Sequence, residues 1–448
     1  MRKILSIIVL LLLGVTFAQR IEIRWFIGLG AGTQEAQVTA QQAIADEFNA
    51  SQDRINLTLE VAAQSPFDVL ATEIAAGNAP DIVGPMGIRG RASFPGVWLD
   101  LTDLIATNNY DLNDFDPALV DFYRLPGQGQ LGLPFAVYPS YITYNKDLFD
   151  EAGLAYPPSD FGQPYVDADG TEKPWNIDTL RDLATFLTVD ANGNDATSPD
   201  FDPDNIIQWG FDVPNNDDLR GRATLFGPGN FVDADGNAVI PDNWVTGIKW
   251  HYDAMWNDHF YPTAAYKNST LLLEGNTFDS GHVAISDNHL WYQACCMTTL
   301  SANWDIAPKP SYDGVVTAKL HADTLSIMNS TEHPQEAFEA LSYIIGPAAS
   351  RLVSAYGGMP ARKSLQATFL ETFAEDQFPG ADVNWAVVTE SLSYPDIPNH
   401  EEGMPNYNVA RDRYDVFNAY INSTPNLDMD AELETLRTDL QVIFDQAR

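Results

Sequence analysis

The sequence predicts an α/β protein with a mostly parallel sheet and enough chain for two domains. Residues 21–27 alternate and are rich in β-branched and aromatic side chains, which is typical of a buried strand. A helical pattern carried by Val38, Ile44 and Phe48 follows, and residues 55–61 return to a strand. Strand, helix and strand in this order form a βαβ unit with parallel strands. The 448 residues suffice for two compact domains.

The elements that follow keep the same character. A helix is predicted from Ser65 and Pro66, which suit a cap and a first turn, to Gly77, which suits a helix end. Pro80 stops this helix, and a short strand follows it. Further strands are predicted at 82–83, 131–137 and 141–144, and further helices from 145 and from 333.

The chain changes composition between residues 156 and 245, where Pro, Asp, Asn and Gly dominate. Turn pairs occur at Asp169-Gly170, Asn192-Gly193 and Asp235-Gly236. We therefore predict a hairpin- and turn-rich insertion at about 156–245 on one of the two domains.

The first 18 residues have the features of a cleavable secretory signal peptide. Arg2 and Lys3 precede an apolar run over residues 4–13, and small residues lead to Ala18. The run is too short to span a bilayer, which needs about 20 residues. No Cys is present near its end to carry a lipid. We expect cleavage after Ala18 and a soluble periplasmic or extracellular protein.

Charge and cysteine content exclude several classes of function. The formal net charge is −38, from 24 Lys and Arg against 62 Asp and Glu. Such a surface repels nucleic acid and anionic lipid, and the few cations disfavour anionic ligands; a high-salt habitat is an alternative cause of the acidity. The only cysteines, Cys295 and Cys296, are adjacent. A bridge between neighbours is strained, so we interpret them as two buried thiols.

Motifs for catalysis or cofactor binding are weak. The loop with Gly28, Gly30 and Gly32 has Thr33 where a dinucleotide fingerprint needs a small residue, so we interpret it as a close-approach loop. Glu35 follows it at the expected cleft edge. No catalytic residue is nominated and no cofactor is expected. Oxygen-bearing residues alternate at Asp190, Asn192 and Asn194, which favours an Asx-rich turn and leaves a structural calcium open.

Aromatic residues are the richest resource for binding, with 10 Trp, 18 Tyr and 23 Phe. Sugars present apolar C–H faces and a rim of hydroxyls, so a sugar site combines flat rings with polar side chains. Trp291, close after Asp287 and His289, and Tyr356, before two glycines, lie in such surroundings.

Five strings in order resemble the extracellular solute-binding proteins of the maltose-binding type, and together they extend over nearly the whole mature chain. They are IAAGNAPDI (74–82), LPF continuing to YNKDLFDEAGL (133–154), GHVAI with a Trp ten residues after its Gly (281–291), DIAPKP (305–310) and GGMPARKS (357–364).

The resemblance implies a type II periplasmic-binding-protein-like fold, in which two α/β lobes are joined by a hinge around a central ligand cleft. The chain would cross between the lobes near 137–141, 305–309 and 346–352. The lobes implied are 19–138 plus 309–348 for the N-terminal lobe, and 139–308 plus 349–448 for the C-terminal lobe.

The resemblance also implies site residues. Asp81 would accept a hydrogen bond from a ligand hydroxyl, and a sugar ring would stack on Trp291. Asp323 lies where relatives have a cleft loop, although they often carry Gly in place of His321 and Ala322. The residues implied with less support are Glu35, Tyr141, Tyr356 and Arg362.

These features imply a monomeric, non-enzymatic binder of a neutral mono- or oligosaccharide that delivers its ligand to the membrane permease of an ABC importer. Two alternatives stay open at this point. A secreted carbohydrate-active enzyme would share the two lobes, and a receptor for a membrane sensor would differ only in its partner.

Overall fold

The computed structural model describes residues 20–125, 127–213, 218–297, 299–401 and 403–447. The predicted signal peptide, residues 1–18, lies outside the described residues. Within the described ranges, every helix is too short or too polar to cross a membrane.

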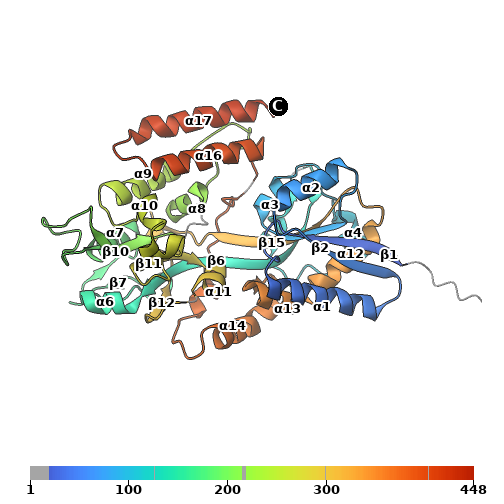
Figure 1. Cartoon of the computed structure of the whole chain (residues 1–448), viewed down its shortest axis with the longest axis horizontal. Helices are drawn as coiled ribbons and strands as arrows, with labels where there is room; N and C mark the ends of the chain where they lie inside the picture. Colours follow the sequence, from blue (N-terminus) through green and yellow to red (C-terminus); the bar gives the residue numbers. More distant parts are fainter. Residues whose placement is uncertain (1–19, 126, 214–217, 298, 402, 448) are drawn as a thin grey trace, which may run out of the picture.

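A ten-stranded mixed sheet runs along the molecule and is flanked by helices (Figure 1). Its strands are β1 (Ile21–Ile27), β2 (Ile55–Val61), β3 (Ile82–Met86), β6 (Leu133–Asn145), β9 (Val189–Asp190), β10 (Ile206–Asp212), β11 (Val283–His289), β12 (Trp304–Ala307), β15 (Leu320–Ile327) and β16 (Met359–Pro360). The spatial order is β2-β1-β3-β15-β6-β11-β10-β9, with β12 and β16 also paired to β6.

The helices of the described residues vary in length from 4 to 17 residues. They are α1 (Glu35–Ser51), α2 (Pro66–Ala75), α3 (Ile88–Ala92), α4 (Thr102–Thr107), α5 (Pro117–Asp121), α6 (Lys146–Ala152), α7 (Ile177–Phe186), α8 (Leu219–Ala223), α9 (Asp242–Trp256), α10 (Ala264–Lys267), α11 (Leu290–Cys296), α12 (Pro334–Ile344), α13 (Ala349–Tyr356), α14 (Lys363–Gln377), α15 (Ala386–Ser391), α16 (Tyr407–Ile421) and α17 (Met429–Asp445).

Strand β6 is shared by both halves of the molecule, and all of its residues are buried. Residues 133–139 of this strand pair with β15, and residues 140–144 pair with β11. We call β1, β2, β3 and β15, with the helices on them, the first lobe. The second lobe contains β9, β10, β11 and β12. The lobes therefore join at about residue 139, where the first crossing was predicted.

The first lobe contains the predicted βαβ unit. Strand β1 pairs in parallel with β2 and with β3, and α1 packs on them. Trp25 and Ile44 are buried in its core together with Phe48. The prediction of an α/β fold with a parallel start is confirmed.

The second lobe has a core of its own under α7 and α9, which includes Phe149, Leu180 and Phe211. Helices α16 and α17 lie side by side over this lobe (Figure 1). Trp244 of α9 packs in one cluster with Tyr414 of α16 and Leu436 of α17. The end of the chain thus extends the second lobe with a helical layer.

The segment predicted as an insertion contributes more than hairpins. One small hairpin pairs β7 (Tyr165–Val166) with β8 (Glu172–Lys173), around the turn at Gly170. The same segment also contains α7 and β10, and β10 pairs in parallel with β11 in the main sheet. Neither α7 nor β10 was predicted, because turn residues flank both elements and their apolar patterns are short.

The crossing predicted at 346–352 is wrong, whereas the chain does pass between the lobes from β12 to β15. Leu352 and Val353 of α13 are buried in the same core as Trp25, and α13 packs against α1. This amphipathic helix therefore stays with the first lobe, although the sequence placed residues after 348 with the second. The domain limits at single-residue level stay predictions.

The prediction of two buried thiols is wrong for Cys296, which lies in a disulfide at the end of α11. The described part of the chain contains no free cysteine. An oxidised sulfur agrees with the predicted export, because disulfides persist outside the cytoplasm.

Candidate functional site

Seven side chains from different parts of the chain gather where β6 passes from one lobe to the other. This interlobe cluster is formed by Tyr138 on β6, His289 at the end of β11, Trp291 on α11, His321 and Asp323 on β15, and His400 and Glu401 in the loop before α16.

Strand pairing explains much of this convergence. His321 lies opposite Tyr138 in the antiparallel pair of β15 with β6, and His289 lies opposite Ser140 in the pair of β11 with β6. Asp323 shares a strand face with His321, since alternate residues of a strand point the same way. The sheet itself therefore brings side chains of both lobes to one place.

Asp323 is the central acceptor of the cluster. Its Oδ2 accepts a hydrogen bond of 3.1 Å from the hydroxyl of Tyr138. Burial and the nearby charge of Glu401 raise the pKa of Asp323 to about 6, against the opposing effects of Tyr138 and His321. A carboxyl with this pKa can accept a hydrogen bond from a ligand hydroxyl, and in its protonated form it can also donate one.

Three histidines form a row of edge-to-face rings beside Asp323. The ring centroids of His289 and His321 are 4.3 Å apart, and those of His321 and His400 are 4.8 Å apart. Burial and neighbouring positive charges, first His321 and then Lys319, lower the pKa of His289 well below its ordinary value, so its ring is neutral.

Two carboxylates contact the second and third members of this row. His321 Nδ1 lies 3.6 Å from Glu401 Oε1, and His400 Nδ1 lies 2.7 Å from Asp396 Oδ2. Donor atoms of His321, His400 and Glu401 all lie within 4.8 Å of one another. Among the described residues, these three could hold a metal ion.

Trp291 offers a flat ring at the edge of the cluster. It is only partly buried, and it stacks on His289 with a centroid distance of 5.4 Å and an angle of 11° between the planes. The stacked histidine fixes the indole plane. A sugar ring can pack on an indole held in this way.

A hollow of about 280 Å³ lies between the lobes, and Gly403 in its lining follows Glu401 of the cluster by two residues. Its walls come from Arg91 and Trp98 of the first lobe and from Met404 and Tyr407, which follow the Glu401 loop. Burial and the charges of Asp323 and Glu401 raise the pKa of Tyr123 well above its ordinary value, and Arg91 opposes them. The hollow approaches the size of small-molecule sites, which start at about 300 Å³.

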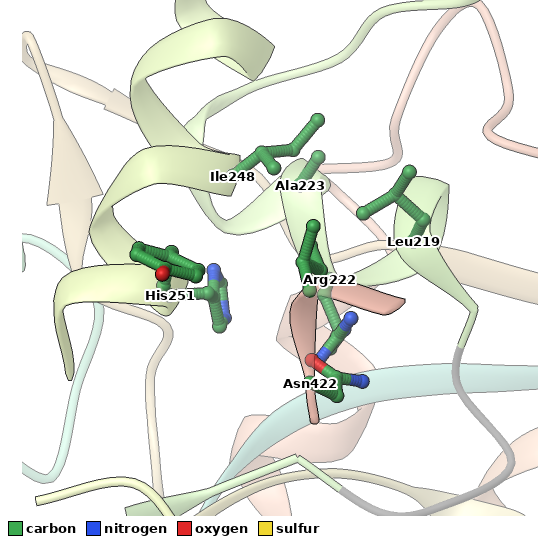
Figure 2. A pocket seen from close by; sticks show the side chains of 8 residues that line it. Leu219, Arg222, Ala223, Ile248, His251 and Asn422 are labelled. Atoms are coloured by element: carbon green, nitrogen blue, oxygen red, sulfur yellow. The ribbon is translucent and has the colours of Figure 1, made fainter. Parts of the chain in front are cut away.

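A second hollow lies inside the second lobe and is far smaller, about 10 Å³ (Figure 2). Arg222, His251 and Asn422 are among its lining residues. This volume holds at most a single water molecule, since one water needs roughly 10–15 Å³. It is too small for a sugar.

The structure brings three of the predicted site residues together. Trp291 and Asp323 belong to the interlobe cluster. Tyr356 lies nearby, because the charge of Asp323 adds to burial in raising its pKa. Its hydroxyl also faces the glycine loop, since a Cβ on Gly32 would lie 3.5 Å from it. Gly32 has φ of +111°, so the close-approach interpretation of this loop agrees with its geometry.

The structure places Asp81 and Tyr141 outside the cluster. Asp81 directly precedes β3, and its two carboxylate oxygens accept hydrogen bonds from the backbone N–H of Arg24 and from the hydroxyl of Thr331. Tyr141 is fully buried on β6 and donates to Gln293 Oε1 at 2.7 Å. Both side chains are occupied in holding the fold.

Glu35 and Arg362 also lie outside the cluster. Glu35 is exposed in the first turn of α1. Arg362 packs over the ring of Phe115 at 4.7 Å and donates to the Ile345 carbonyl and the Tyr110 hydroxyl. Its hydrogen bonds join segments within the first lobe.

The loop considered for calcium is closed by its own hydrogen bonds. The carboxylate of Asp190 accepts from the backbone N–H groups of Asn192, Asn194 and Asp202 at 2.8–2.9 Å. This is the Asx-rich turn that the sequence favours. Occupancy by calcium stays a prediction.

The residues of the cluster that were not predicted from the sequence as site residues are Tyr138, His289, His321, His400 and Glu401. The strand register could have paired Tyr138 with His321, but His400 and Glu401 come from an irregular loop with no periodic pattern.

Comparison with known proteins identifies the class of the chain. Residues 30–351 match the family model of the bacterial extracellular solute-binding proteins, and the chain belongs to this family. No curated protein matches it by sequence.

Solved structures agree with this fold. One is the ABC substrate-binding protein Lmo0181 from Listeria monocytogenes in complex with cycloalternan, with 19% identity, coverage of 94% of this chain and 98% of that chain, and a TM-score of 0.69. Another is the cyclic alpha-maltosyl-1,6-maltose binding protein from Arthrobacter globiformis. Its sequence identity is 17%, the match covers 96% of this chain and 100% of that chain, and the TM-score is 0.69. A third is the sugar transporter RHE_PF00321 from Rhizobium etli in an open conformation. Its sequence identity is 18%, the match covers 94% of this chain and 100% of that chain, and the TM-score is 0.65. The two-lobed, type II periplasmic-binding-protein-like fold is thereby confirmed.

Proposed function

We propose that this chain is the extracytoplasmic substrate-binding subunit of an ABC importer, which captures a neutral mono- or oligosaccharide between its lobes and delivers it to the membrane permease. The observation that carries the proposal is the interlobe cluster. It joins a fixed indole, Trp291, to a buried carboxyl, Asp323, and a phenol hydroxyl, Tyr138. Such a set matches the apolar faces and hydroxyl rims of sugars.

Three further features support the proposal. The net charge of −38 disfavours anionic ligands. The proteins from Listeria and Arthrobacter are described with cycloalternan and with cyclic alpha-maltosyl-1,6-maltose as their ligands. The open conformation of the Rhizobium protein supports lobes that separate for ligand entry. We propose that the mature chain acts as a soluble monomer in the periplasm or outside the cell.

Calorimetric titration of the purified mature chain tests this function. The panel contains neutral mono-, di- and oligosaccharides, with amino acids and short peptides as the contrasting class. We expect saturable 1:1 binding of at least one saccharide. Binding of an amino acid or peptide, with no heat from any saccharide, would contradict the proposal.

One observation favours an enzyme as a second candidate. A Cβ placed on Gly87 would lie 3.6 Å from Glu401 Oε2 and 3.8 Å from Asp323 Oδ1, so two carboxyl groups face one point. Their pKa values are pushed apart. Burial raises that of Asp323 to about 6. Burial would also raise that of Glu401, but His321 and His400 outweigh this effect and lower it.

Glycosidases use such pairs at separations of about 5–9.5 Å. Prolonged incubation with the bound saccharide and chromatography of the products distinguish the two candidates. The binding proposal predicts no new reducing ends. Hydrolysis that disappears in both Asp323→Asn and Glu401→Gln would establish the enzyme instead.

A further inference from the structure

The donor atoms at His321, His400 and Glu401 have the chemistry of a transition-metal site. Two imidazoles and one carboxylate are ligands that Zn²⁺ and related ions accept, whereas Ca²⁺ and Mg²⁺ prefer oxygen alone. The three donor atoms lie within 4.8 Å of one another, and His321 Nδ1 is 3.6 Å from Glu401 Oε1.

These separations are close to those of a formed site. Metal–ligand bonds of about 2.0–2.2 Å in a tetrahedral site place neighbouring ligand atoms about 3.3–3.6 Å apart. The pair of His321 and Glu401 has nearly this spacing already. The widest separation among the three donor atoms is at most 4.8 Å, so these atoms must approach one another by on the order of 1 Å when an ion binds.

The surroundings of His400 support a metal-binding orientation. Its Nδ1 is bound to Asp396 Oδ2 at 2.7 Å, which fixes the ring and directs Nε2 to the other side. Histidine ligands in metal sites commonly have such a carboxylate behind them. Asp396 is itself held, because its Oδ1 accepts from the backbone N–H of Leu320 at 2.8 Å. The loop that carries His400 is thus fastened to the start of β15.

His289 gives an independent sign that the site accommodates a ligand. This side chain is completely buried, and neither of its ring nitrogens has a hydrogen-bond partner among the described residues. Its ring lies 4.3 Å from that of His321. A buried polar group without a partner destabilises the fold unless something binds it. His289 is therefore available as a further nitrogen beside the three donors.

We propose that His321, His400 and Glu401 bind one divalent transition-metal ion of the Zn²⁺ class. The ion ties β15 to the loop before α16, next to Asp323, and His289 or water completes its coordination. Metal binding at this place would fasten the junction of the two lobes. The proposal does not depend on the saccharide assignment, because it concerns the ion alone.

The test uses the mature chain freed of metal by a chelator and dialysed. Zn²⁺ is titrated calorimetrically in a non-chelating buffer that contains millimolar Mg²⁺, which occupies the weak carboxylate sites of this acidic surface. We expect one equivalent of Zn²⁺ per chain. His321→Ala and Glu401→Gln should each weaken binding by at least about 100-fold, while His333→Ala, a matched change at the start of α12, should have no effect.

Circular dichroism shows whether each variant is folded, and the nearly isosteric Glu401→Gln decides the outcome if His321→Ala is not. Co²⁺ provides a second readout, since a tetrahedral site gives intense visible bands that should be lost in both variants. The proposal is overturned if no stoichiometric Zn²⁺ binding occurs. Equal Zn²⁺ affinity in the wild type and Glu401→Gln also overturns it.

Discussion

Asp287 forms ion pairs with two lysines at the junction of the lobes, and Asp287→Asn should destabilise the chain strongly. Lys309 Nζ lies 2.5 Å and Lys319 Nζ 3.3 Å from Asp287 Oδ2, and none of the three side chains is exposed. Breaking a buried ion pair by removing one partner leaves an uncompensated charge in the interior. The cost of this is about 3–5 kcal/mol. An asparagine can keep a hydrogen bond but not the charge.

The pH dependence of this effect has a definite sign. Burial alone would raise the pKa of Asp287, but Lys309 and Lys319 outweigh it and hold the pKa below its ordinary value. The stabilisation is therefore fully present above the unfolded-state pKa of about 3.9 and is lost as pH falls through the folded-state value. The unfolding free energies of the wild type and Asp287→Asn should therefore differ by the full amount, about 3–5 kcal/mol, at pH 7 and equally at pH 5.

Urea unfolding followed by circular dichroism measures this difference. Asp430→Asn is the matched control, since Asp430 pairs with Lys249 on the surface with its side chain 79% exposed. Surface pairs contribute less than about 1 kcal/mol. If Asp287→Asn is also within about 1 kcal/mol of the wild type, the account of this junction as a buried charge cluster is wrong.

Three further changes test other parts of the structure. Trp291→Ala should weaken saccharide binding by about 1–3 kcal/mol, whereas Tyr420→Ala, on the exposed side of α16, should leave it unchanged in the same calorimetric titration. Burial and the charge of Arg222 lower the pKa of His251 to about 3 (Figure 2), so the wild type should lose stability as pH falls from about 6.5 towards 3. His251→Gln should flatten this dependence in urea unfolding at several pH values, and an unchanged slope would refute the assignment. A Cβ on Gly210 of β10 would lie 1.7 Å from a backbone oxygen of α7, so Gly210→Ala should lower the unfolding free energy by more than about 2 kcal/mol. A loss under 1 kcal/mol would contradict that close approach.

The fold was predictable because its signals are local. The alternation in residues 21–27 and the helix that follows indicate a βαβ unit without any knowledge of distant contacts. Elements such as β10 were missed because turn residues surround a short strand. The third crossing was misplaced because no local pattern in α13 indicates which lobe its apolar side covers.

The site was predictable only in part, for a physical reason. Trp291 and Asp323 were proposed from motifs, and the structure brings them together. Asp81 came from a motif of the same kind, yet its carboxylate is occupied by Arg24 and Thr331. A motif records that a residue matters but not whether it serves the fold or the ligand. His400 belongs to the interlobe cluster through a loop whose position depends on tertiary packing, so its place could not be predicted from the sequence.

The position of a bound saccharide in a crystal structure tests the central claim most directly. The sugar with the highest affinity in the titrations would be crystallised with the mature chain. We predict a sugar ring packed on the indole of Trp291, with a hydroxyl within hydrogen-bond distance of Asp323. A saccharide bound away from both side chains, with the interlobe cluster unchanged, would contradict the account.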